Sequence, residues 1–127
     1  MSTIPKAVVS EFWRLMASNE FASVKAVLSP GLVVEWPQSN ERIRGAENFV
    51  SVNEQYPTTG RWQFKVNRLI AEGSVVVTQV SITDGKQNAE PVSFFTVEGG
   101  KITHLLEYWP EPYVAPDNRR HLTEPMA

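Results

Sequence analysis

The spacing of apolar residues changes partway along the chain, from the period of a helix to the period of a strand. In the first half, apolar residues recur three or four positions apart, which is the spacing of one helix face. After Gly60, apolar and polar residues alternate, as side chains do along a strand with one buried face. This order predicts helices first and a sheet of hairpins afterwards, which is an α+β chain with helices on one face of the sheet.

Three helices are predicted before the main part of the sheet. The first runs to about residue 17, residues 29–31 end the second, and the third covers residues 46–55. Ser2 or Thr3 would cap the first helix. A short strand over residues 32–36 and a returning segment around Ile43 separate the last two helices. The apolar faces are formed by Val9, Phe12 and Met16, then by Phe21, Val24 and Leu28, and finally by Phe49 and Val50.

Four further strands are predicted in the second half, separated by turn signals. They begin at Trp62 and cover, in order, residues 62–66, 75–83, 92–97 and 102–109. Asp84-Gly85 is a strong hairpin signal, and the glycines at 73, 99 and 100 mark the other turns. Short connections between neighbouring strands favour antiparallel pairing. The expected sheet is therefore mainly antiparallel.

Length, charge and composition exclude several classes of protein. With 127 residues, the chain is expected to form a single domain over residues 1–127. The net charge is −2 and no basic stripe is present, so nucleic-acid binding is not expected. No apolar run reaches the roughly 18 residues of a membrane-spanning helix. The N-terminus lacks the pattern of a secretory peptide and cysteine is absent, which is compatible with a cytoplasmic location.

Glu107 is the strongest candidate for chemistry. In the last predicted strand it alternates onto the same face as Leu105 and Trp109. A carboxyl group among apolar side chains is desolvated, and its pKa rises toward neutrality, as a general acid/base requires. The alternative is a structural glutamate that is bonded to Gln79, to Arg68 or to a backbone amide.

Gln79 and Ser81 are the polar candidates on the strand predicted over residues 75–83. If their shared face lines the cavity, Gln79 would orient a carbonyl or hydroxyl group of a ligand, and Ser81 would add a second hydrogen bond. Equally, both side chains would only satisfy Glu107. Ser81 is a weak candidate for a nucleophile because no adjacent base is evident.

Metal and cofactor sites are not predicted. The two histidines, His104 and His121, are too far apart in the sequence to indicate a metal pair, and no cysteine is available. Gly99 and Gly100 open a strand and not a helix, so they lack the context of a phosphate-binding loop.

The tryptophans have two interpretations, a pocket lining or a core. Trp36 and Trp109 stand at strand ends and would form an aromatic mouth for a flat apolar ligand. Trp13 and Trp62 are assigned to the core or to an interface. Tyr56, directly after the third helix, is a possible hydrogen-bond donor.

The whole pattern resembles the SnoaL-like, nuclear transport factor 2-like superfamily, whose fold is a cone-shaped α+β barrel. The likeness covers nearly the whole chain. The resemblance implies a curved, mainly antiparallel sheet wrapped by three N-terminal helices, in a superfamily that includes isomerases, cyclases, dehydratases, epoxide hydrolases and non-catalytic modules. Its local marks are Pro57 to Trp62 with Phe64, Ala71-Glu72-Gly73, Ser93-Phe94-Phe95, and Gly100-Lys101-Ile102 leading to Glu107-Tyr108-Trp109.

The chain departs at two places from members of this superfamily that have further charged catalytic residues. Trp36 stands where ketosteroid isomerases have the aspartate that acts as the base, and tryptophan cannot abstract a proton. Gln79 and Ser81 stand where limonene-epoxide hydrolases have an arginine and an aspartate. Glu107 alone matches an acid, which resembles the single acid/base carboxylate of SnoaL-like cyclases.

The expected function is the binding of a small apolar or cyclic molecule, with cofactor-independent isomerase or cyclase chemistry. Glu107 would transfer the proton, and Gln79 would polarise an oxygen of the substrate. A non-catalytic ligand-binding or dimeric interaction module is the alternative. The predicted ligand-binding residues are Trp36, Trp109, Ser81, Leu105 and Tyr56.

Two further expectations concern assembly and the C-terminal tail. Leu106 and Tyr108 point to the outer face of the sheet, and apolar residues on both faces predict a homodimer that pairs through the sheet. The prolines at 110, 112 and 116 predict an extended strap, lying along the barrel or across a partner, with Tyr113 as its anchor.

Overall fold

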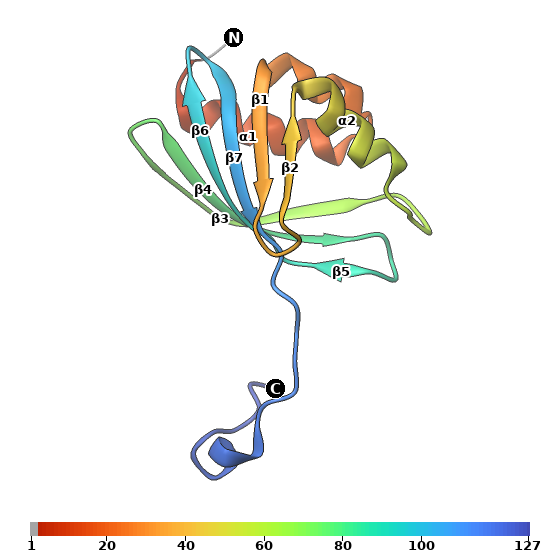
Figure 1. Ribbon diagram of the computed structural model, residues 1–127, viewed down its shortest axis with the longest axis vertical. Coiled ribbons are helices and arrows are strands. Elements are labelled where there is room, and N and C mark those ends of the chain that lie inside the picture. Colours follow the sequence, from red (N-terminus) through yellow and green to blue (C-terminus); the bar gives the residue numbers. More distant parts are fainter. Residues whose placement is uncertain (1–2) are drawn as a thin grey trace.

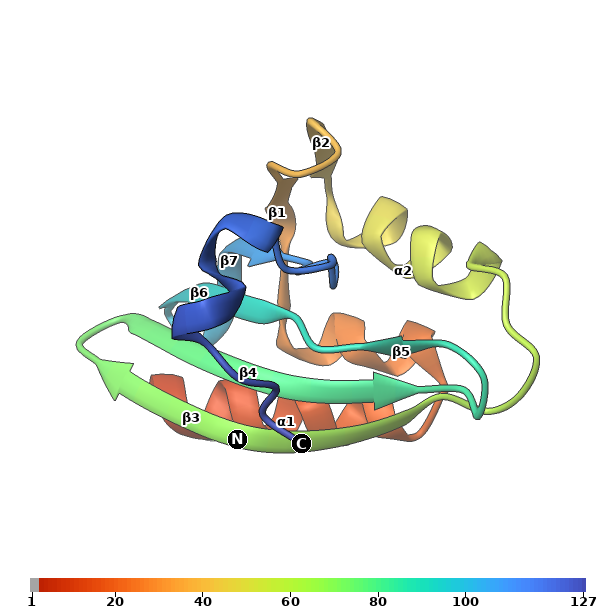
Figure 2. The same cartoon turned by 90° about the horizontal axis from the view of Figure 1, so that it is seen from below.

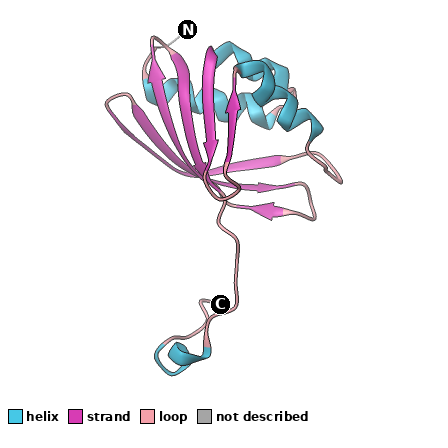
Figure 3. Ribbon diagram, in the orientation of Figure 1, coloured by secondary structure: helices cyan, strands magenta, loops and turns pink. Residues whose placement is uncertain are grey.

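The computed structural model describes residues 3–127, and its element order confirms the predicted α+β chain (Figures 1 and 3). Two helical segments open the chain, the second of which is a 3-10 helix that ends at Val27, and the third helical segment follows two strands. Ile4, and not Thr3, precedes the first helix, and Ser2 lies outside the described residues. The helical segments before the main sheet are α1 (Pro5–Ala17), η1 (Phe21–Val27) and α2 (Ala46–Gln55). The strands are β1 (Leu28–Trp36), β2 (Glu41–Arg44), β3 (Gln63–Glu72), β4 (Val75–Thr83), β5 (Asn88–Ala89), β6 (Val92–Glu98) and β7 (Lys101–Tyr108).

The strands form one curved, unclosed sheet in the order β2-β1-β7-β6-β4-β3, with β5 paired to β4 (Figure 2). Every pair is antiparallel except β1 with β7. That parallel pair joins the first and last strands of the sheet in sequence, so it places the end of β1 beside the end of β7. Residues from both halves of the chain therefore meet at one end of the sheet.

The strand predicted over residues 32–36 begins earlier, at Leu28. The turn-forming residues 29–31 lie inside it, and the pairing with β7 shifts its register between Leu28 and Val33. A bulge of this kind accommodates Pro30, which has no amide hydrogen to contribute to the ladder. The second helix therefore ends before these residues, at Val27, and residues 29–31 belong to the strand that follows it.

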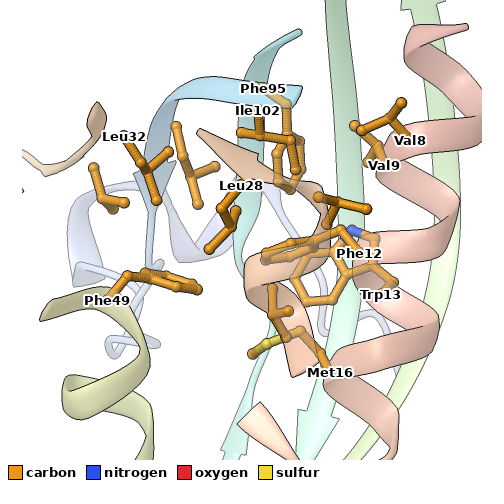
Figure 4. Packing of buried hydrophobic residues seen from close by; sticks show 14 of the residues in the cluster. Val8, Val9, Phe12, Trp13, Met16, Leu28, Leu32, Phe49, Phe95 and Ile102 are labelled. Carbon is orange, nitrogen blue, oxygen red and sulfur yellow. The ribbon is translucent and has the colours of Figure 1, made fainter. Parts of the chain in front are cut away.

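The apolar core lies between the concave face of the sheet and the helices (Figure 4). Helix α1 packs across β3, β4 and β6, and α2 packs on β1 and β2. Phe12 is at the centre, with ring centroids 4.9 Å from Trp13 and 5.1 Å from Phe95. Trp13 is buried as predicted, and its Nε1 donates a hydrogen bond to Thr78 Oγ1 at 3.2 Å. The strand β4 thus turns Thr78 toward the core.

The C-terminal arm, residues 110–127, leaves the sheet and projects away from it (Figure 1). Its residues are all exposed, and its helical part is one 3-10 segment, η2 (Asp117–Leu122). Tyr113 is 80% exposed, so it does not anchor the arm to the barrel, and that prediction is wrong for the chain's own sheet. The prolines explain the extended start of the arm, because they hold φ near −65° and interrupt regular hydrogen bonding.

Candidate functional site

A cavity of about 640 Å³ opens between the helices and the end of the sheet where β1 and β7 lie side by side. Residues of α1 and α2 form one wall, and the β1–β2 turn, β7 and the start of the arm form another. Nine of the lining residues are aromatic, from Phe12 on α1 to Trp109 beyond β7. A cavity with this volume and lining suits a small molecule with a flat apolar body.

Glu107 lies at the inner wall of this cavity and is 4% exposed. Its Oε1 accepts a hydrogen bond from Trp36 Nε1 at 3.0 Å, and its Oε2 accepts one from Ser93 Oγ at 2.6 Å. Ser93 is the antiparallel strand partner of Glu107, whereas Trp36 comes from β1 on the other side of β7. The carboxyl group is therefore held from both neighbouring strands.

Burial raises the pKa of Glu107 above the ordinary value of a glutamate, and the bonds from Ser93 and Trp36 oppose that rise. Both donors are neutral, and within residues 3–127 no lysine, arginine or histidine forms an ion pair with this carboxyl group. A carboxylate has about four acceptor positions, so two positions stay available beyond these two bonds. The group can therefore hold or release a proton toward the cavity.

Two aromatic pairs stand at the cavity. The rings of Trp36 and Trp109 meet edge to face, with centroids 6.1 Å apart and planes at 87°. The backbone amide of Trp109 donates to the side chain of Gln38, which ties the β1–β2 turn to the end of β7. Tyr56 and Trp62 form a second edge-to-face pair at 5.8 Å. Trp36, Trp109, Tyr56 and Trp62 all line the cavity, and ligand binding by the first three stays a prediction.

Gln79 and Ser81 do not reach the cavity, and their predicted contact with Glu107 or a ligand there is wrong. They lie on the outer face of the sheet, where Gln79 Oε1 accepts a hydrogen bond from Arg68 and Ser81 Oγ accepts one from Asn67 at 2.7 Å. The inward positions of β4 are Val76, Thr78, Val80 and Ile82, all buried. A sheet with one covered face tends to turn polar residues outward, but Thr78 on the inner face of β4 is polar as well, so alternation alone does not identify the covered face.

Leu105 shares the inner face with Glu107, as predicted, but it belongs to the core and does not line the cavity. It is 1% exposed and lies two residues before Glu107 on the same face of β7. Sequence reasoning missed Ser93, although its alternation with Phe95 and Val97 toward one buried face could have identified it.

A second buried acid, Asp84, stands beside the cavity in the turn between β4 and β5. It accepts hydrogen bonds from the backbone amides of Thr59, Lys86 and Gln87 at 3.0, 2.9 and 2.7 Å. These bonds hold the pKa of Asp84 far below its usual value. Through Thr59 and Thr58 it joins the α2–β3 loop to the turn that carries the lining residue Gln87. Asp84 therefore shapes one side of the cavity rather than facing a ligand.

Across residues 3–127, no three side chains of histidine, cysteine, aspartate or glutamate gather where they could hold a metal ion. In the same part of the chain, no helix has the length and apolar content needed to cross a membrane.

Comparison with known proteins identifies similar folds and one family model. The model of a SnoaL-like domain matches residues 9–105. A crystal structure from Kribbella flavida DSM 17836, of a protein proposed to be a ketosteroid isomerase, is 30% identical, with a TM-score of 0.88 over 97% of this chain and 90% of that one. An NTF-2 like protein of unknown function from Burkholderia xenovorans LB400 is 26% identical, with a TM-score of 0.78 over 97% and 95%.

An LEH-like epoxide hydrolase from M. tuberculosis is also 26% identical, with a TM-score of 0.66 over 84% of this chain and 82% of that one. No curated protein matches the chain. The Kribbella flavida and Burkholderia xenovorans structures each match 97% of this chain, and the residues before the arm make up a smaller share of the chain than this. Both matches therefore include part of the projecting arm. These neighbours are described as proteins of different or unknown function, so the likeness identifies the fold, and the chemistry must be argued from the residues of the site.

Proposed function

We propose that this chain, which belongs to the SnoaL-like domain family, binds a small apolar, cyclic molecule in its cavity and moves protons on it without a cofactor. The observation that carries the proposal is the position of Glu107, a buried carboxyl group with a raised pKa at the wall of an aromatic cavity. A carboxyl group whose pKa lies nearer to neutrality can act both as base and as acid at the working pH.

The proposed reaction is a proton transfer next to a carbonyl group. Ionised Glu107 takes a proton from the carbon beside the carbonyl, the C–H electron pair moves into an enolate, and the neutral acid returns the proton to another atom. Trp36 and Ser93 hold the carboxyl group in one orientation through both steps. Tyr56 and Asn53 line the same cavity, and we assign to them the role of donors to the substrate oxygen, in place of Gln79.

A non-catalytic ligand-binding module is the second candidate, and one observation favours it. Each oxygen of Glu107 already accepts one hydrogen bond, so the carboxyl group also fits a structural role between β1, β7 and β6. The other charged residues of the cavity wall, Glu41 and Glu111, carry the same sign and give Glu107 no cationic partner.

The homodimer is part of the proposal, and one apolar row across the outer face supports it. Ile70, Val77, Phe94 and Leu106 are successive strand partners across β3, β4, β6 and β7. Ile70 is 64% exposed and Phe94 37%, so the row is open in the single chain. A continuous apolar row on a sheet face is typical of an interface, and a twofold pairing covers it on both copies. A monomeric mass by light scattering at micromolar concentration would contradict this pairing.

The reaction is tested by hydrogen exchange in deuterated water. A panel of cyclic ketones is incubated with the protein, and the loss of proton signal beside the carbonyl is followed by NMR. We expect exchange with the wild type and with Glu72→Gln, a matched control at the exposed end of β3, and none above background with Glu107→Gln. Ketones that bind the wild type without exchanging would support the non-catalytic alternative. A cytoplasmic location stays a prediction.

A further inference from the structure

The charged side chains that line the cavity all have one sign. They are Glu41, Glu107 and Glu111, and among the described residues no lysine, arginine or histidine belongs to the lining. Glu41 and Glu111 are exposed, whereas Glu107 is buried, so the negative charge is concentrated toward solvent. An anionic ligand would meet like charges here and would find no cationic partner at the wall.

The cations that are next to lining residues in the sequence are engaged elsewhere or lie outside the lining. Arg42, next to Glu41, donates to Glu35 at 2.9 Å on the outer face of the sheet. Arg61, next to Trp62, donates to the carbonyl oxygens of Ala17 and Ser18 at the end of α1. Lys86 precedes the lining residue Gln87 but does not itself line the cavity. These cations therefore leave the acidic character of the wall in place.

The two exposed carboxylates flank the tryptophan pair. Glu41 is the strand partner of Trp36 in the β1–β2 hairpin, and its Oε1 accepts a hydrogen bond from Ser39 Oγ at 2.5 Å. Glu111 follows Trp109 by two residues at the start of the arm. An aromatic face attracts a cation through its negative π surface, and the attraction is greatest for tryptophan. Aromatic rings and carboxylates at the same place form a combination suited to an organic cation.

We infer that the ligand of this cavity carries a positive charge, and that it is an organic amine whose cyclic, apolar body also carries the carbonyl group of the proposed reaction. The ring system fills the aromatic cavity, and the ammonium group lies at Trp36 and Trp109 between Glu41 and Glu111. The inference rests on the proposed function, because it concerns the ligand of the same cavity. It adds the sign of the ligand's charge and the end of the ligand that stays near solvent.

The test uses three probes that share one ring system and differ in charge: naphthylmethylammonium, naphthalenemethanol and naphthalenecarboxylate. Binding is followed by NMR through the indole N–H signals of Trp36 and Trp109, assigned with tryptophan-to-phenylalanine variants. We expect the ammonium probe to bind about threefold to tenfold more tightly than the alcohol, the scale of a cation–π contact with exposed carboxylates, and the carboxylate probe to bind most weakly.

The double variant Glu41→Gln, Glu111→Gln should reduce the preference for the ammonium probe to the part that the tryptophan rings supply, and should leave the affinity for the alcohol unchanged. Glu72→Gln alters charge away from the cavity and should leave the preference intact. Equal affinity for the ammonium and alcohol probes, or tighter binding of the carboxylate, would overturn the inference while leaving the proposed pocket standing. If none of the three probes moves either tryptophan signal at millimolar concentration, the proposed ligand-binding function fails together with the inference.

Discussion

Two buried acids, Glu107 at the inner wall of the cavity and Asp84 beside its rim, have opposite electrostatic environments. Glu107 receives two bonds from neutral side chains, and its pKa is raised because burial outweighs them. Asp84 receives three backbone amides, as well as side-chain donors, and its pKa is strongly lowered. Both residues are less than 10% exposed, so burial alone does not decide the direction of the shift.

The difference lies in the number and kind of donors. Backbone amides in a turn are fixed by the fold and all point at the Asp84 carboxylate, so they stabilise its charged form. The Glu107 carboxyl group faces aromatic surface and keeps acceptor positions open toward the cavity. An acid that is saturated by backbone amides holds two loops together and has a lowered pKa, whereas Glu107, with two neutral side-chain donors, has a raised pKa beside the cavity.

The largest expected effect is on turnover in Glu107→Gln. The substitution retains the shape of the side chain and removes the titrating proton, so proton exchange or turnover should fall by at least ~100-fold. Ligand affinity, measured by NMR titration, should stay roughly unchanged. A rate equal to that of the wild type would assign Glu107 to a structural role and would remove the contrast with Asp84.

The next effect is on stability in Asp84→Ala. The change leaves three backbone amides without their acceptor and releases the α2–β3 loop from the β4–β5 turn. We expect the melting temperature to fall by about 5 to 10 °C. Circular dichroism or scanning calorimetry measures this, with Asp117→Ala in the arm as the matched control. A fall no larger than that of the control would show that Asp84 does not brace the rim.

The two acids should also make the stability of the protein depend on pH in opposite directions. Because the folded pKa of Glu107 is raised, its contribution is complete below the ordinary glutamate pKa of about 4.3 and is lost as pH rises through the folded value. Because the folded pKa of Asp84 is lowered, its contribution is present above the ordinary aspartate pKa of about 3.9 and is lost as pH falls.

Urea unfolding across pH separates these two contributions. The stability of the wild type should fall as pH rises through the folded pKa of Glu107, and Glu107→Gln should not show this fall. The stability of the wild type should also fall as pH decreases below the ordinary aspartate pKa, and Asp84→Ala should not show that fall. Identical pH dependence in the wild type and Glu107→Gln would contradict a raised pKa.

The smallest expected effect comes from Ser93→Ala, which removes one donor from Glu107. The Ser93 bond lowers the pKa of Glu107, so its loss should raise that pKa further and move the limb of the pH–rate profile that reports Glu107 to higher pH. The free energy of unfolding should fall by about 1 kcal/mol, the usual net value of one such bond. Ser23→Ala, on the surface of η1, serves as the control. An unmoved pH–rate profile would indicate that Glu107 is not the group that titrates during the reaction.

The order of elements, the turns and the inward direction of Glu107 follow from the sequence, because they depend on local patterns. Period 3.6 and period 2 identify α1 and β4 without reference to the rest of the chain, and Asp84-Gly85 marks its hairpin through the conformational freedom of glycine. Alternation alone also puts Leu105 and Glu107 on one face of β7, and Trp109, which directly follows the strand, continues the same alternation.

Only the tertiary structure decided which face of β4 is covered, and therefore that Gln79 stands outside while Thr78 stands inside. Alternation defines two faces of a strand but does not say which of them a helix will cover. The donors of the two acids are equally non-local: Trp36 reaches Glu107 from 71 positions away, and Thr59 reaches Asp84 from 25. Such contacts depend on the parallel pairing of β1 with β7 and on the meeting of distant loops, which no local pattern in the sequence records.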